Sequence, residues 1–170
     1  MTKSQPLPIS PLPPVRGRES LKSWSIRWLL NRLPSYRRAG GKLVFLASDL
    51  TFARVRVKYG WRTYGQKNSI FGGALYATID PCYVIMLQWR LCSGFAVWDK
   101  SATIDFRKPG RAALYSDFAC SENELAAIRR EAHDHGHTER VLHVELRDAA
   151  AVVHAAFEKA VVIKRRKAES

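Results

Sequence analysis

One carboxylate stands out because it lies in an otherwise apolar stretch. The segment 69–89, SIFGGALYATIDPCYVIMLQW, contains Asp80 as its only charged residue. Apolar residues recur along this segment at helical spacing and nearly all round the helix, which predicts a helix surrounded by protein. A carboxylate in such a helix costs free energy unless it is paired or has a function. Asp80 is therefore the first candidate for chemistry, and a structural aspartate bonded to the backbone or to an arginine is the alternative.

Two glycines lie two helical turns before this carboxylate. Gly73 precedes Asp80 by seven residues, so both lie on one face of the predicted helix, and Gly72 comes directly before it. The first N–H groups of a helix lack intrahelical partners, and glycine allows a ligand to approach them closely. A carbonyl oxygen placed there would be polarised by these N–H groups and by the helix dipole. The alternative is that the glycines only permit tight packing of the helix against a sheet.

The elements around this helix are predicted mainly as strands. In TFARVRVKY (51–59) Ala53, Val55 and Val57 alternate with basic residues, which is typical of a half-buried strand. LVFLAS, just before it, extends that strand or pairs with it as a hairpin. Strands are also predicted in the segments 96–106, 112–119, 140–148 and 151–165, with a short helix begun by a capping box at Ser121 and Glu124. One central helix with consecutive antiparallel strands around it predicts an α+β fold.

Alternation also assigns faces within the strand 96–106. It places four apolar residues on one face and four polar residues on the other: Trp98, Ala102, Ile104 and Phe106 against Asp99, Ser101, Thr103 and Asp105.

The predicted domain organisation has four parts. Five of the eight prolines fall within the first 14 residues, so 1–20 is expected to be a disordered tail. An N-terminal amphipathic helix follows at 21–34, then the folded domain at 35–164 and a basic tail at 165–170. The helix carries Leu21, Trp24, Trp28, Leu29 and Leu33 over about half its circumference. It is interpreted as a lid packed on the domain, with a membrane-surface helix as the alternative.

The net charge of +13 is distributed unevenly along the 170 residues. Residues 1–42 hold nine Lys and Arg against Glu19 alone, while residues 43–158 hold 14 basic and 13 acidic side chains. Because a nucleic-acid-binding domain concentrates charge on one face of its fold, we expect no nucleic-acid partner. Three cysteines without CxxC spacing and the lack of a secretory signal favour the cytoplasm.

The motifs NSIFGGALYATIDP at 68–81 and ATIDFRKPGRAALYSDF at 102–118 resemble the hotdog-fold thioesterase superfamily. The closest similarity is to a branch of mostly uncharacterised hotdog proteins, and it covers roughly residues 30–164. The resemblance implies a long central helix wrapped by a curled antiparallel β-sheet. It also implies a homodimer or a dimer of dimers, with sites for acyl-CoA or acyl-carrier-protein thioesters at the subunit boundary.

The resemblance also assigns roles to residues. Asp80 matches the helix carboxylate that attacks the thioester or activates water, and Gly72 and Gly73 match the backbone donors to the carbonyl. Asn68, Phe71 and Tyr76 are candidate substrate contacts. Lys108 and Arg111 flank a Pro-Gly turn that lies near the CoA phosphates in relatives, although a solvated turn is equally compatible with the sequence.

The sequence departs from the better-known pattern before the two glycines. Relatives of the phenylacetate-pathway type have His-Gly-Gly where this chain has Phe71, and an Asn six residues earlier where it has Gly65; Asn68 is three residues out of register. Two functions therefore stand side by side: a thioesterase, and a non-catalytic acyl-thioester-binding or structural dimer. No cofactor is expected apart from CoA as part of the substrate. No metal is expected either, since His133, His135 and His137 lack a second cluster of matching spacing.

Overall fold

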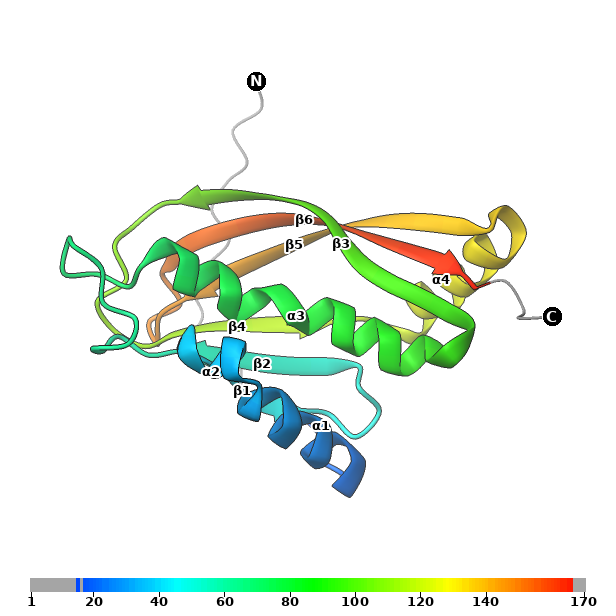
Figure 1. Ribbon diagram of the computed structural model, residues 1–170, viewed down its shortest axis with the longest axis horizontal. Helices are drawn as coiled ribbons and strands as arrows, with labels where there is room; N and C mark the ends of the chain where they lie inside the picture. Colours follow the sequence, from blue (N-terminus) through cyan, green and yellow to red (C-terminus); the bar gives the residue numbers. More distant parts are fainter. Residues whose placement is uncertain (1–14, 16, 167–170) are drawn as a thin grey trace.

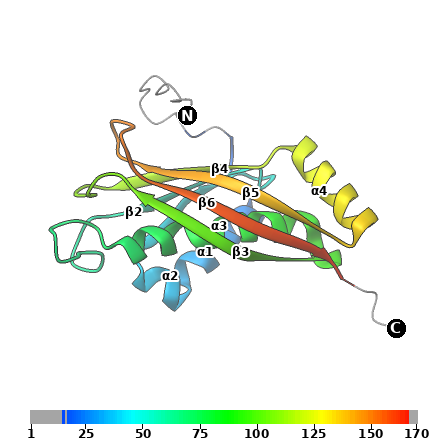
Figure 2. The ribbon, with the colours of Figure 1, turned by 90° about the horizontal axis from the view of Figure 1, so that it is seen from above.

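The computed structural model describes residues 15 and 17–166. Its elements follow in chain order (Figures 1 and 2): α1 (Leu21–Arg32), α2 (Pro34–Arg38), β1 (Gly41–Leu46), β2 (Phe52–Val57), α3 (Gly72–Leu91), the short 3-10 helix η1 (Cys92–Gly94), β3 (Phe95–Phe106), β4 (Leu114–Ala119), α4 (Glu122–His135), β5 (His137–Arg147) and β6 (Val153–Arg165).

The six strands form a single antiparallel sheet in the order β1-β2-β4-β5-β6-β3. The sheet curls around α3, which lies across its concave face, while α4 lies at one end (Figures 1 and 2). The segment LVFLAS pairs with β2 as a hairpin, which decides between the two predicted arrangements. The α+β prediction, with a long central helix wrapped by an antiparallel sheet, is confirmed.

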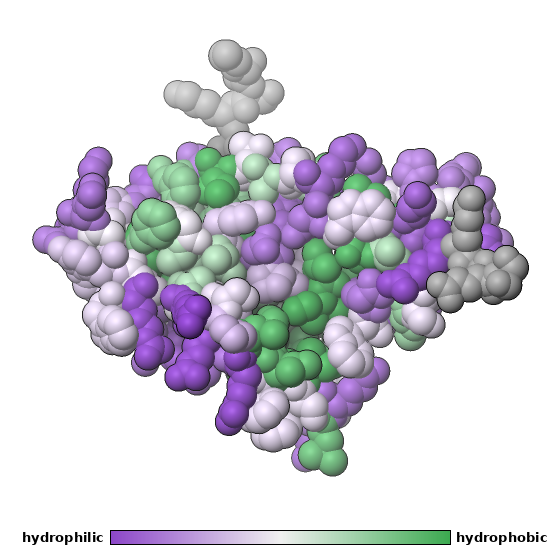
Figure 3. All heavy atoms as spheres, in the orientation of Figure 1, coloured by the Kyte–Doolittle hydropathy of each residue, from purple (hydrophilic) through white to green (hydrophobic). Residues whose placement is uncertain are grey.

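The core lies between α3 and the concave face of the sheet. Alternation in β2 holds as predicted, because Ala53, Val55 and Val57 are buried against the helix. Within α3, Ile79, Met86 and eight other residues are buried. The prediction that α3 is surrounded by protein on every side is wrong for a single copy of the chain. Its side toward β3 and α1 is partly open, and a hydrophobic strip is visible there over its second half (Figure 3).

No helix among the described residues is long and apolar enough to span a bilayer.

A β-bulge changes which side chains of β3 point inward. The register between β3 and β6 shifts between Asp99 and Ser101, so the strand alternation skips a residue at Lys100. As a result Asp99 faces α3 together with Ala102 and Ile104, whereas Trp98 is exposed on the opposite side. The predicted faces were wrong for Trp98 and Asp99, because alternation in sequence does not show where an extra residue is inserted.

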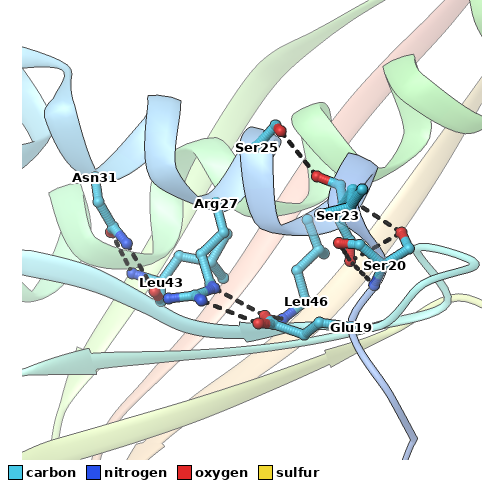
Figure 4. Close-up of polar contacts among 9 residues, drawn as sticks. Glu19, Ser20, Ser23, Ser25, Arg27, Asn31, Leu43 and Leu46 are labelled. Atoms are coloured by element: carbon cyan, nitrogen blue, oxygen red, sulfur yellow. Dashed lines mark hydrogen bonds and ion pairs between the residues drawn. The ribbon is translucent and has the colours of Figure 1, made fainter.

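The two edges of the sheet differ. At β1, the Asn31 side chain donates to the Leu43 carbonyl (2.9 Å) and accepts from the Leu43 N–H (2.8 Å), and Glu19 accepts from the Leu46 N–H (Figure 4). These contacts hold α1 along the edge strand. At the other edge, Gln88 bonds to the backbone of the first residues of β3. The stretch of β3 from Trp98 to Phe106 has no such cover among the described residues.

The N-terminal boundary differs from the prediction. Residues 1–14 and 16 of the expected tail lie outside the described residues. Ser20, however, caps α1 in a reciprocal capping box with Ser23, and Glu19 forms an ion pair with Arg27 (Figure 4). Residues 18–20 are therefore part of the folded domain, because their polar groups satisfy backbone groups of α1 and β1. At α4, Ser121 accepts from the Glu124 N–H, but the described residues show no return bond from Glu124.

Candidate functional site

Asp80 lies on the open side of α3, facing the β3 edge of the sheet. Its side chain is 41% exposed, although the neighbouring positions Ile79 and Cys82 are buried. The carboxylate is therefore accessible to solvent rather than enclosed in the core. Its position near the free stretch of β3 leaves it open to a molecule that binds along this edge.

A buried lysine from β6 holds this carboxylate. The side chain of Lys159 is fully buried, and its ammonium lies 3.3 Å from Oδ1 of Asp80 and 2.9 Å from Oδ2 of Asp99. The same ammonium donates to the Asp80 backbone carbonyl at 2.6 Å. One cation thus bridges two carboxylates and one carbonyl, so the cluster carries a net negative charge when both aspartates are ionised.

The cluster changes the proton affinity of its members. Burial raises the pKa of Asp99 above its usual value, and the nearby Asp80 charge raises it further, although Lys159 acts in the opposite direction. Oδ1 of Asp99 is buried and has no hydrogen-bond partner among the described residues. Burial, together with the Asp80 and Asp99 carboxylates, raises the pKa of Tyr76 to about 12. A pair of carboxylates in unequal environments is the arrangement that separates a proton acceptor from a proton donor.

The start of α3 offers unpaired backbone donors. Ala74 and Leu75 donate to the Phe71 carbonyl, but the N–H groups of Gly72 and Gly73 have no partner among the described residues. Aromatic rings pack against both glycines. A Cβ on Gly73 would lie 2.5 Å from the Phe71 ring, and a Cβ on Gly72 would lie 3.0 Å from the Phe106 ring. A Cβ at either position would therefore force the adjacent ring to shift, while the two N–H groups have no partner among the described residues.

Three of the other predicted site residues, Asn68, Lys108 and Arg111, lie around this helix start without touching Asp80. Asn68 is exposed in the preceding loop, where its side chain accepts a hydrogen bond from the Tyr64 hydroxyl. Lys108 and Arg111 are exposed on the turn between β3 and β4, and no contact of either side chain with the cluster exists among the described residues. The turn itself is close to the helix start, because the Gly110 carbonyl accepts from the Ile70 N–H at 2.8 Å. The structure therefore brings together the loop, the turn and the start of α3.

Two members of the cluster were missed from the sequence. Lys159 lies at an inward position of β6, between Phe157 and Val161, which are both buried. This period-two pattern was available, and a lysine on the apolar face of a strand is a signal for a buried partner. Asp99 gave no such signal, because the bulge reverses its direction. Among the described residues no group of three His, Cys, Asp or Glu side chains is arranged to hold a metal ion.

Comparison with known families identifies the chain. The family model for a domain of unknown function (DUF4442) matches residues 23–163, which is most of the sequence. The chain belongs to the DUF4442 family. A search of curated proteins gives no significant match for this DUF4442 protein.

Solved structures share its fold. A protein of unknown function from Pseudomonas aeruginosa, described as a probable thioesterase, matches with a TM-score of 0.79 and 19% identity over 88% of this chain and 100% of its own. A thioesterase from Haemophilus influenzae matches with a TM-score of 0.64 and 9% identity, over 86% and 93% of the two chains. The PaaI protein of the E. coli phenylacetic acid degradation operon matches with a TM-score of 0.58 and 17% identity, over 86% and 94%. These likenesses show that this DUF4442 protein shares the fold of these structures.

Proposed function

We propose that this protein hydrolyses acyl thioesters of CoA or of an acyl carrier protein at a site formed between two copies of the chain. The observation that supports this most directly is the exposed carboxylate of Asp80, which is bound by the buried Lys159 of β6. Asp80 lies on α3, the same helix that presents the free N–H groups of Gly72 and Gly73. The carboxylate is the base or nucleophile, and the N–H groups polarise the carbonyl.

The spacing along α3 requires the second copy. Asp80 follows Gly73 by seven residues, and a helix rises 1.5 Å per residue, so the two are separated by roughly 10 Å along the axis. A single thioester carbonyl is too small to reach both. A second copy that pairs along the free stretch of β3 by a two-fold axis would bring Asp80 of one copy toward Gly73 of the other.

The proposed reaction is a hydrolysis with water as the other substrate. With Asp80 as the base, the water oxygen attacks the carbonyl carbon while its proton passes to the carboxylate. The N–H groups of Gly72 and Gly73 stabilise the negative charge on the carbonyl oxygen. The carbon–sulfur bond then breaks, and the proton moves from Asp80 to the leaving thiolate, which gives a free acid and a thiol. With Asp80 as the nucleophile, the same products form through an acyl–aspartate anhydride that water cleaves.

The open side of α3 offers a surface for the acyl chain. Val84 and Ile85 are half-buried there, Trp89 is 45% exposed, and the strip is hydrophobic in Figure 3. Lys108 and Arg111, on the turn against the helix start, are placed for the phosphates of CoA.

A non-catalytic acyl-thioester-binding dimer is the second candidate. Two observations favour it: the Lys159 ammonium already neutralises Asp80, and the apolar Phe71 stands before the two glycines. Such a protein would use the same cleft and the same free N–H groups without turnover.

Purified full-length protein is tested against a panel of acyl-CoAs with detection of the free thiol. We expect turnover in the wild type and a loss of at least 100-fold in Asp80→Asn with an unchanged particle mass by light scattering. Asp134→Asn, an exposed aspartate on α4, is the matched control and should retain full activity. Tight acyl-CoA binding without turnover in the wild type would support the second candidate.

A mixing experiment tests whether the site is shared. Asp80→Asn and Gly73→Ala homodimers are each expected to be inactive, because the first lacks the carboxylate of both sites and the second forces the Phe71 ring to shift at the helix start of both sites. After subunit exchange at equal amounts, half of the dimers are mixed and each contains one intact site, which gives about a quarter of wild-type activity. No recovery on mixing, with exchange verified by mass, would contradict a site made of two copies.

A further inference from the structure

A hollow of about 850 Å³ lies between α1, the beginning of β1, the end of β2 and the loop that follows it. Seven Lys and Arg side chains line it, and no Asp or Glu does. Six of the nine basic residues that the sequence has within residues 1–42 lie in residues 22–42. These residues fold against the domain and join the basic residues of β2 and its loop on one face.

The charges around this hollow are not neutralised. Arg27 is paired with Glu19, but the other six form no ion pair within the described part of the chain. These six are Arg32, Arg37, Lys42, Arg56, Lys58 and Arg62. Buried Arg residues elsewhere differ in this respect: Arg54 is paired with Asp117, and Arg90 with Glu122. The segments 21–42 and 56–67 together hold ten Lys and Arg and no acidic residue, so this face is strongly positive.

Large apolar side chains are exposed on the same elements, α1 and the loop after β2. The α1 helix buries Ile26 and Leu30 against the domain, whereas Leu21 is 86% exposed and Leu29 55% exposed. Hydrophobic spheres accordingly project over α1 at the lower end of the molecule, next to the hydrophilic side chains gathered to the left (Figure 3). Trp61, on the loop after β2, is 85% exposed.

Tryptophan and arginine are interleaved on this face. The Arg32 guanidinium lies 4.4 Å from the centre of the Trp28 ring, and that of Arg62 lies 4.8 Å from the Trp61 ring. In each pair a guanidinium and an indole ring lie side by side at the protein surface. Tryptophan favours the boundary between water and hydrocarbon, and arginine favours the phosphates above it.

We propose that the face formed by α1, α2 and the loop after β2 binds the surface of a bilayer that contains anionic phospholipid. A bilayer presents phosphate directly above hydrocarbon, and it therefore matches both the unpaired cations and the exposed leucines and tryptophans. The hollow is of a size to receive a phospholipid headgroup, with Arg56 and Lys58 on its wall. The proposal does not depend on hydrolysis at Asp80.

Other occupants match only part of this face. A nucleic acid would neutralise the cations but would leave Leu21 and Leu29 in water. A second copy bound through the same face would bring the six unpaired cations of each copy together, which opposes association. A free phosphate compound would fill the hollow but would leave Leu21 and Leu29 in water.

Vesicle flotation of the full-length protein tests the proposal. Vesicles of phosphatidylcholine with roughly 30% phosphatidylserine should bind at least tenfold more tightly than phosphatidylcholine alone, and added salt should weaken binding. Arg32→Gln/Arg62→Gln and Leu21→Ser/Leu29→Ser should each weaken binding at least fivefold. Binding should also shift the tryptophan emission to shorter wavelength, and Trp61→Phe should reduce that shift.

Matched controls use exposed residues on other faces. Lys164→Gln/Arg165→Gln, near the end of β6, removes two cations, and Val141→Ser removes an apolar side chain that is 56% exposed on β5. Neither should change binding, and circular dichroism should show that all variants fold. Equal losses in controls and test variants, no preference for anionic vesicles, or tighter binding to single-stranded RNA or soluble glycerophosphoserine than to the vesicles would each overturn the proposal.

Discussion

The ammonium of Lys159 donates a hydrogen bond of 2.9 Å to Oδ2 of Asp99, and the side chain of this lysine is fully buried. A buried cation is tolerated only when its partners are fixed around it, and here β3, β6 and α3 each supply one part of the cluster. The same contact orients the carboxylate of Asp80, so stability and the proposed chemistry depend on one side chain.

We expect Lys159→Met to lower the free energy of unfolding by about 1–3 kcal/mol, because the half-buried Asp99 carboxylate loses its compensating charge. Urea unfolding followed by circular dichroism measures the loss. Lys164→Met, an exposed position on the same strand, is the control and should change stability by less than about 0.5 kcal/mol. The double variant Lys159→Met/Asp99→Asn should recover part of the loss. An equal loss in the double variant would contradict the electrostatic explanation.

We expect Asn31→Asp to destabilise the protein by about 1–3 kcal/mol. The Asn31 amide donates to the Leu43 carbonyl, and aspartate would place an acceptor against that oxygen instead. Thermal unfolding measures the effect. Asn68→Asp is a matched control, since Asn68 only accepts from the Tyr64 hydroxyl and aspartate retains this ability. Similar losses in the two variants would show that charge rather than the lost donor is responsible.

We expect Cys92→Gly to stabilise the protein by about 1 kcal/mol. Cys92 ends α3 with φ 62° and ψ −160°, a conformation that is nearly restricted to glycine. Its side chain is exposed, so little packing is lost. Cys92→Ala keeps the backbone strain and should give no gain. A lower melting temperature for the glycine variant than for the alanine variant would exclude strain at this residue.

We expect Glu131→Gln to flatten the dependence of stability on pH between about 4.5 and 2. Hydrogen bonds from Arg140 and Thr138 lower the pKa of Glu131 from 4.5 to about 2 in the folded protein. Between these values the unfolded chain binds more protons, so the contribution is present above pH 4.5 and is lost as pH falls toward 2. Urea unfolding at several pH values measures the slope. An unchanged slope in the variant would assign the acid sensitivity to other carboxylates.

The sequence predicted the parts of the site that lie on α3 better than the parts that the sheet contributes. Asp80 and the two glycines lie on one helix, so their relation depends only on local spacing. Asp99 and Lys159 meet through the pairing of β3 with β6, and the bulge that turns Asp99 inward is a property of that pairing. The sequence analysis identified the apolar residues of α1 but did not show which of them are buried. Ile26 and Leu30 pack against the domain, and Leu21 and Leu29 are therefore left exposed.

Side chains cover the β1 edge of the sheet but leave most of the β3 edge free, and this difference limits how many strands can be added. The side chains of Asn31 in α1 and of Glu19 just before it occupy the outward backbone groups at Leu43 and Leu46, so no further strand can add beside β1. If two copies join through β3, each contributes a blocked edge to the combined sheet, and both ends of that sheet are then closed. Strand addition therefore stops after one partner, and a chain with long antiparallel strands is protected from fibre formation by a single helix laid against one edge.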